Sequence, residues 1–274
     1  MSIQLENNNL KYLHADCTNC FGLCCVALPY AKSADFAFNK EGGSPCQNLQ
    51  SDYRCSIHKN LRSKGFKGCT VYECFGAGQK VSQFTYKGID WREHPASAKE
   101  MFDVFPIMQQ LHEMLCYLFE ALFFEEAKPL HADIESALEK TENLTNQDAS
   151  AILNLDIQAH RAMVNDLLLQ TSELVRSKVK NKDKRVKRGS SFIGAKMRRE
   201  NFRGANLRGA LLIAADLREA DLRDCDFIGA DLRDADLSGA NLAGSFFLTQ
   251  AQINSAKGDQ RTKLPEGLKK PDHW

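Results

Sequence analysis

Eight cysteines between residues 17 and 74 are the side chains best suited to chemistry in this sequence. Their spacing is C-x2-C-x3-C-C, then C-x8-C and C-x4-C, and a histidine follows the sixth cysteine by three residues. Short steps of two or three residues let successive sulfur atoms turn toward one point, as a soft metal requires. The predicted ligands are Cys17, Cys20, Cys24, Cys25, Cys46, Cys55, Cys69 and Cys74, with His58 as a further candidate.

The cellular compartment decides between metal ligands and disulfides. The start of the chain, MSIQLENNNLKYL, lacks the basic and then apolar pattern of a secretory signal. The most apolar segment, residues 114–124, is too short to cross a membrane and has Glu120 inside it. We therefore expect a cytoplasmic protein with no membrane contact, whose reduced thiols bind metal or carry redox chemistry.

The adjacent residues Cys24 and Cys25 bear on the number of metal centres. Their side chains point in different directions on either a helical or an extended backbone. They would serve two centres, or act as one ligand and one neighbouring thiol. Eight thiolates suffice for two four-sulfur zinc sites or for one iron–sulfur cluster with thiols to spare, and the spacing leaves both open.

The cysteine pattern resembles the CxxCxxxCC family of zinc- or iron-chelating domains, over residues 10–80 approximately. The resemblance implies that the cysteines chelate zinc or iron. It also implies an alternative function, because the flagellin lysine N-methylases belong to that family. Nothing in the sequence supplies a site for a methyl donor, so we favour a non-enzymatic role without the sequence deciding it. The family usually has tyrosine where this chain has His58.

The segment 93–188 contains the elements expected to support this region. Apolar residues recur there at three- and four-residue steps, which predicts three helices in an antiparallel bundle that is scaffold or a homodimer interface. The third helix is expected to continue to about Lys178. Before the bundle, residues 81–86 are predicted to form a short strand. The histidines of the bundle are expected at its surface or boundary: His112, His131 and His160.

The junction after the bundle, residues 176–188, carries eight basic residues and the single acid Asp183. Such a run could contact nucleic-acid phosphates. It has no interleaved aromatic residues for base stacking, and half of it is expected to continue the preceding helix. We therefore expect a solvated linker and regard nucleic-acid binding as the weaker interpretation.

From Phe192 the sequence repeats every five residues, with a large apolar residue two positions after a small one in most repeats. A period of five would scatter these residues around a helix and throw them to alternate faces of a strand. It buries one face only if the chain turns a corner every five residues, which stacks Leu212 on Leu232, 20 residues later. Cys225 lies in the small column, so it is assigned to the core, as is Cys116 with its apolar neighbours.

This pattern resembles the pentapeptide-repeat family, whose A-(D/N)-L-x-x signature appears at residues 205–207 and 230–232. The resemblance implies a right-handed quadrilateral β-helix and a surface for a protein partner. Some members bind type II topoisomerases by mimicking DNA, which is a second alternative function. Here acidic and basic residues alternate on the outer positions, so a phosphate-like field would largely cancel.

We therefore predict an α+β multidomain protein with four parts. A cysteine-rich zinc- or iron-chelating domain occupies 1–92, and a helical bundle with its basic linker occupies 93–188. The β-helix occupies 189–256, and a tail at 257–274 is expected to fold Trp274 back on the last coil. The expected function is that of a cytoplasmic metal-binding protein, with zinc or an iron–sulfur cluster as cofactor. Its repeats would bind a protein partner, and the metal centre would serve redox or metal sensing.

Overall fold

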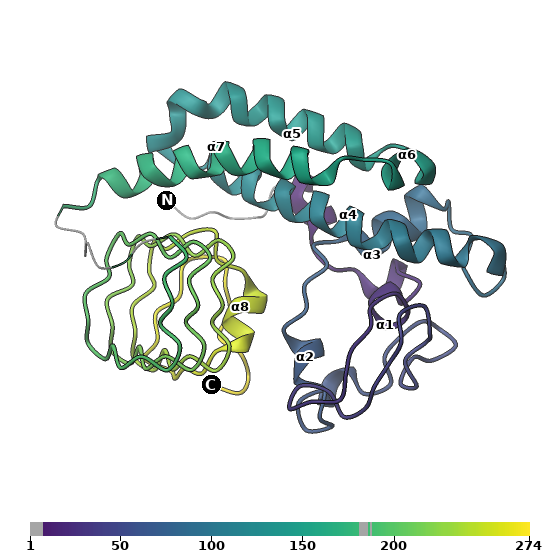
Figure 1. Ribbon diagram of the computed structural model, residues 1–274, viewed down its shortest axis with the longest axis horizontal. Helices are drawn as coiled ribbons and strands as arrows, with labels where there is room; N and C mark the ends of the chain where they lie inside the picture. The colour runs from purple at the N-terminus through teal and green to yellow at the C-terminus, as the bar shows by residue number, and fades with distance from the viewer. Residues whose placement is uncertain (1–7, 181–185, 187) are drawn as a thin grey trace. The chain divides into compact units, whose positions relative to one another are not determined.

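Two compact units make up the described part of the protein (Figure 1). This computed structural model describes residues 8–180, 186 and 188–274. One unit contains residues 8–122 and Leu130–Leu167, and the other contains Phe123–Pro129 and Leu168–Trp274. Within the described ranges, no helix combines the length and the apolar character needed to cross a membrane. The four-part division expected from the sequence stays a prediction.

The cysteine region folds as a series of short helical turns joined by loops. These turns are η1 (Asn8–Leu13), η2 (Cys17–Asn19), α1 (Leu23–Val26), η3 (His58–Asn60), α2 (Lys67–Thr70), α3 (Ala77–Gln79) and the π-helix η4 (Lys80–Thr85). The strand predicted at residues 81–86 is therefore wrong. Val81 and Ser82 are buried next to each other while Gln83 and Phe84 are exposed, and a strand would bury alternate residues instead.

Longer helices follow the cysteine region. They are α4 (Pro95–Leu122), α5 (His131–Thr145), α6 (Ala149–Leu153) and α7 (Ile157–Ser177), with the 3-10 turn η5 (Glu125–Leu130) after α4. The single third helix predicted from the sequence is two helices, because each has its own cap. Asp148 accepts a hydrogen bond from the N–H of Ala151, and Asp156 accepts one from the N–H of Ala159. Apolar residues of α4, among them Phe105, pack with residues of α1, α3, η4 and α6.

The repeats form a coil in which the chain pairs with itself 20 residues later. Parallel bridges join Ser191 to Leu211, Lys196 to Asp216, Asn201 to Asp221 and Asn206 to Asp226, and the series continues along the coil. The predicted offset of 20 residues is thereby confirmed. Each bridge is isolated, and the described residues contain no β-strand. The predicted α+β class with a right-handed quadrilateral β-helix is therefore wrong, because turns linked by single bridges replace the sheet.

A corner at every fifth residue explains why no strand forms. From Gly189 to Gly244 every fifth residue has a positive φ, including the non-glycine residues Arg199 at 61° and Ala214 at 54°. This left-handed conformation turns the chain and is most accessible to glycine. Between two corners a single residue is paired, whereas a strand needs several consecutive paired residues.

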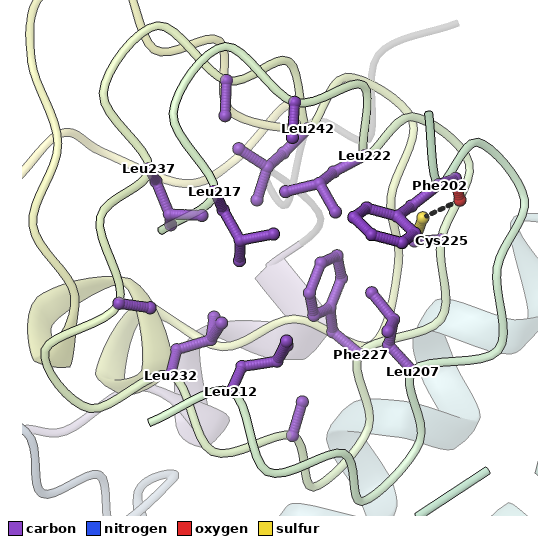
Figure 2. Close-up of a cluster of buried hydrophobic side chains, with 14 of the residues drawn as sticks. Phe202, Leu207, Leu212, Leu217, Leu222, Cys225, Phe227, Leu232, Leu237 and Leu242 are labelled. Atoms are coloured by element: carbon purple, nitrogen blue, oxygen red, sulfur yellow. Dashed lines mark hydrogen bonds between the residues drawn. The ribbon is translucent and has the colours of Figure 1, made fainter. Parts of the chain in front are cut away.

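The inside of the coil is filled by the large apolar residue of each repeat, as Figure 2 shows. The side chains that converge there are at most 1% exposed from Leu207 to Leu242 and include Leu212, Leu217, Leu222, Phe227, Leu232 and Leu237. Cys225 is fully buried among them, and its thiol donates a hydrogen bond to the carbonyl oxygen of Phe202 at 3.0 Å. Its predicted assignment to the core is confirmed.

The tail returns to the coil after the repeats. Helix α8 (Gln250–Ser255) follows the last repeat, and parallel bridges then join Lys257 to Asp236 and Lys263 to Asn241. Trp274 packs against the core of the coil, and its Nε1 donates a hydrogen bond to the carbonyl oxygen of Ala256 at 3.1 Å. The expectation that Trp274 folds back is confirmed.

Candidate metal centre

Two turns with the same sequence, Cys-Phe-Gly, hold two of the predicted ligands in the same way. They are residues 20–22 and 74–76, which lead into α1 and α3. Both glycines precede their helix in the left-handed conformation, with φ of 68° and 80°. Phe21 accepts a hydrogen bond on its carbonyl oxygen from Trp91 Nε1 at 2.9 Å, and Phe75 accepts one from His112 Nδ1 at 2.7 Å. The repeated Cys-Phe-Gly motif is a signal in the sequence that the spacing of the cysteines alone does not reveal.

Main-chain N–H groups point at the sulfur atoms of both turns. Those of Gly22–Leu23 meet Cys20, and those of Gly76 and Gly78 meet Cys74. Burial raises the pKa of both thiols, that of Cys74 to about 11, and the N–H groups oppose this shift because they stabilise a thiolate. The thiolate is the form in which cysteine binds a metal, and hydrogen bonds to its sulfur orient it.

Three thiols, which we call the first group, pack with Tyr72 against the apolar cluster of α4: Cys20, Cys24 and Cys74. The hydroxyl oxygen of Tyr72 is buried and has no hydrogen-bond partner. Burial raises the pKa of Tyr72, and the charges of the three thiols add to that shift. The first group therefore places three sulfur atoms near a buried polar atom that lacks a partner.

Four other thiols, which we call the second group, lie in and around the next loops: Cys25, Cys46, Cys55 and Cys69. The N–H of Cys46 donates a hydrogen bond to the carbonyl oxygen of Cys25 at 2.9 Å. Tyr30 Oη donates to Cys46 Sγ at 3.2 Å. Burial raises the pKa of Cys69 to about 12, and the charges of Cys25, Cys46 and Cys55 add to the shift. These four sulfur atoms are therefore electrostatic neighbours.

The adjacent residues Cys24 and Cys25 belong to different groups. Both lie on α1, where consecutive side chains diverge by about 100°. Their sulfur atoms are 4.0 Å apart, and the Cys24 thiol donates to the Cys25 sulfur. This contact raises the pKa of Cys24 and lowers that of Cys25. All ten cysteines are free thiols.

A buried lysine lies beside the second group. Lys40 is 6% exposed, and its Nζ donates hydrogen bonds to the carbonyl oxygens of Val26 and Glu41, both at 3.0 Å. Burial lowers the pKa of Lys40, and the charges of Cys46 and Cys25 oppose that shift. A cation here would offset the negative charge of nearby thiolates. No motif or periodic pattern in the sequence marks this residue.

The predicted ligands do not converge on one point. Among residues 8–180, 186 and 188–274, no three His, Cys, Asp or Glu side chains are placed to hold a metal ion. Cys17 and Cys69 are exposed, and so is His58 at the start of η3. The two groups are neighbourhoods of thiols whose sulfur atoms must approach one another further to bind metal. The ligand assignments from the sequence stay predictions.

The histidines of the helices differ from expectation. His112 is 0% exposed and His160 is 7% exposed, so the prediction of surface or boundary positions is wrong for both. His112 holds the turn at Phe75 in place, and His160 Nε2 lies 2.9 Å from Thr141 Oγ1. These contacts are structural, and neither histidine meets a predicted ligand.

The outer side chains of the repeats carry paired charges. Aspartates bind the arginine two residues later, at 2.6 Å in Asp216–Arg218, Asp221–Arg223 and Asp231–Arg233. Glu219 pairs with both Arg198 and Arg199. This surface therefore presents hydrogen-bonding groups of both signs and no long stretch of one sign.

Comparison with known proteins places the repeats first. Residues 188–224 and 210–247 match the family model described as Pentapeptide repeats (8 copies). This model covers the repeats and not the cysteine region, so the resemblance to zinc- or iron-chelating domains gains no support from it. Among solved structures, the pentapeptide repeat protein alr5209 from Nostoc PCC 7120 is 31% identical, with 29% of this chain and 73% of that chain covered and a TM-score of 0.24. Rfr23 from the cyanobacterium Cyanothece 51142 is 24% identical, with coverage of 28% and 54% and a TM-score of 0.19.

A much longer match extends through the cysteine region and the helices. YybG of Bacillus subtilis (strain 168), described as an uncharacterized protein, is 65% identical over 271 residues, which are 98% of this chain and 97% of YybG. The match with the repeat model and the match with YybG agree in the repeats. The chain therefore belongs to the pentapeptide-repeat proteins, in one family with YybG.

Proposed function

We propose that this protein binds metal through its cysteine region and docks a protein partner through its repeats. The observation that carries the metal part is the pair of Cys-Phe-Gly turns, each of which aims two main-chain N–H groups at a sulfur atom. Such donors stabilise the thiolate, which is the form that binds a soft metal. The residues that would hold the metal are the eight cysteines from Cys17 to Cys74, with His58 as a further candidate.

The chemistry of these donors fits zinc or an iron–sulfur cluster. A set made of sulfur atoms selects such metals over magnesium or calcium, which prefer oxygen. The buried hydroxyl of Tyr72 lacks a partner beside three of the thiols, and the buried cation of Lys40 lies beside others. Bound zinc would link the loops and stabilise them, and an iron–sulfur cluster would supply reversible electron transfer. In either case the residues of this chain bind, orient and partly shield the metal.

A sensing role fits the exposure of the region. Cys17 and Cys69 are exposed at its edge, so an oxidant in solution could reach them. Oxidation of a ligating thiolate removes a ligand, and the release of metal would loosen loops that few apolar contacts hold. A cytoplasmic location is part of the proposal, because the thiols must stay reduced to bind.

The repeats support docking of a protein and not mimicry of DNA. Their outer carboxylates are paired with arginines, as in Asp216–Arg218 and Asp231–Arg233, so they lack the uniform negative field of a nucleic acid. A coil with a packed core is a rigid support for such a surface. Full-length protein added in excess to a DNA gyrase supercoiling reaction should leave the rate unchanged, and inhibition would favour the topoisomerase-binding alternative.

The metal proposal is tested by purifying the full-length protein without oxygen and measuring its metal content and visible absorption. Colourless protein with stoichiometric zinc indicates zinc sites, and bound iron with a broad visible band indicates an iron–sulfur cluster. Cys20→Ser should reduce the bound metal, whereas Cys225→Ala removes a thiol from the core of the coil and should leave it unchanged. Folded protein that carries no metal would refute the proposal.

A further inference from the structure

We infer that the cysteine region holds two metal centres of unlike chemistry, divided between Cys24 and Cys25. The inference rests on the proposed metal binding and goes beyond it by assigning the ligands of each centre. The first centre uses the thiols of the first group and the hydroxyl of Tyr72. The second centre uses the four thiols of the second group.

The division follows from the helix that carries the two adjacent cysteines. Side chains of consecutive residues on α1 diverge by about 100°, so they cannot both point at one small ion. Cys24 packs against the apolar cluster of α4, together with Cys20 and Cys74. Cys25 is tied on the other side, since its carbonyl oxygen accepts a hydrogen bond from Cys46 at 2.9 Å. The two sulfur atoms therefore belong to separate neighbourhoods.

The second centre is complete without help from other residues. Cys25, Cys46, Cys55 and Cys69 supply four sulfur atoms, the number that a closed tetrahedral site requires. Tyr30 donates a hydrogen bond to Cys46 Sγ at 3.2 Å, which orients that ligand from outside the sulfur set. A site closed by four thiolates has a structural role.

The first centre has three thiols and needs a fourth ligand. Tyr72 is beside all three, because it packs on the same apolar cluster and each of their charges acts on its hydroxyl. That hydroxyl is buried and makes no hydrogen bond, which is a costly arrangement unless something else occupies its lone pairs. A bound ion would satisfy the oxygen and complete the coordination.

Cys17 is the other candidate for the fourth ligand, since it stands three residues before Cys20. It is exposed, whereas the thiols of the first group are partly buried and pack on the core. The phenol of Tyr72 is a weaker ligand for a soft ion than a thiolate. The first centre thus keeps one replaceable position, as sites that react with outside ligands do, and the second centre does not.

Cobalt(II) distinguishes the two centres, because thiolate-to-cobalt charge transfer grows with the number of thiolates and the visible bands report the geometry. Full-length protein is stripped of metal without oxygen and titrated with cobalt(II). The adjacent variants Cys24→Ser and Cys25→Ser serve as a matched pair, each removing one thiol from α1. Tyr72→Phe and Cys17→Ser then test the fourth ligand of the first centre.

The wild type is expected to bind two cobalt ions, and each of the matched variants is expected to bind one. The ion left in Cys25→Ser should show weaker charge transfer than the ion left in Cys24→Ser. Adding Tyr72→Phe to Cys25→Ser should shift the visible bands, whereas Cys17→Ser should keep two ions and the wild-type spectrum.

The opposite results distinguish a failure of the two-centre division from a failure of metal binding. A single ion in the wild type, or loss of the same bands in both matched variants, overturns the division and leaves metal binding intact. An unchanged spectrum on adding Tyr72→Phe, or loss of the first ion in Cys17→Ser, overturns the assignment of Tyr72. A wild type that binds neither cobalt nor zinc refutes the proposed function itself.

Discussion

A buried ion pair in the repeat unit gives the sharpest prediction about stability. Arg208 Nη1 lies 3.0 Å from Asp226 Oδ2, and the two side chains are 3% and 0% exposed. Burial lowers the pKa of Arg176 on α7, and the charge of Asp226 opposes that shift, so a second buried cation depends on the same carboxylate. Asp226→Ala would leave both guanidinium groups in the interior without this counter-charge.

The expected loss is about 3–5 kcal/mol in the free energy of unfolding, the usual effect of removing one partner from a buried pair. Asp231→Ala is the matched control, because Asp231 occupies the next equivalent position of the coil. Both aspartates accept a hydrogen bond from the N–H two residues later, at 3.0 Å from Ile228 and 3.1 Å from Arg233. The Arg233 side chain is 56% exposed, so the control should lose at most about 1 kcal/mol.

The assay is urea unfolding of the full-length variants followed by circular dichroism, with hydrogen exchange of the repeats to locate the effect. The double variant Arg208→Met with Asp226→Leu should recover part of the loss, because two of the charges are then replaced by apolar groups. Losses for Asp226→Ala and Asp231→Ala that agree within about 1 kcal/mol would refute the claim that burial sets the strength of this pair.

Three further predictions concern titration, backbone and the metal region. Burial lowers the pKa of His112 to about 4, and the unfolded chain titrates near 6.5, so stability should fall as the pH drops through this window, by about 3 kcal/mol. His112→Gln should flatten that slope in thermal unfolding, and an unchanged slope would contradict the assignment. Ala214→Gly relieves a left-handed alanine and should add about 0.5–1 kcal/mol of stability in urea unfolding, while Gly209→Ala at an equivalent corner should remove a similar amount; equal stabilities would contradict this. Gly78→Ala would place a Cβ atom 2.7 Å from Cys20 Sγ and should reduce metal content without removing a thiol, so full metal content would count against the proposed position of Cys20.

The period of five residues was sufficient to predict the offset of 20 residues and the column that contains Leu212 and Leu232. A small and a large residue alternating at this period can be buried together only if the chain turns regularly. The absence of strands among the described residues could not be predicted in the same way. It depends on how many residues each corner takes, and residues such as Arg199 adopt the left-handed conformation without a sequence signal for it.

In the cysteine region the residue types could be read from the sequence, but their neighbours could not. Tyr72 and Lys40 lie outside any periodic pattern, and only the packing of distant segments brings them to the thiols. His112 was misplaced because an amphipathic pattern does not reveal a second buried face of α4. That face meets the turn at Phe75, 37 residues earlier in the chain.

Metal binding by the cysteine region can be measured by native mass spectrometry of the full-length protein, purified without oxygen. We predict a folded protein whose mass exceeds that of the chain by two metal centres, and Cys24→Ser should retain only one of them. A folded protein with the mass of the chain alone, before and after incubation with zinc, would contradict the proposal.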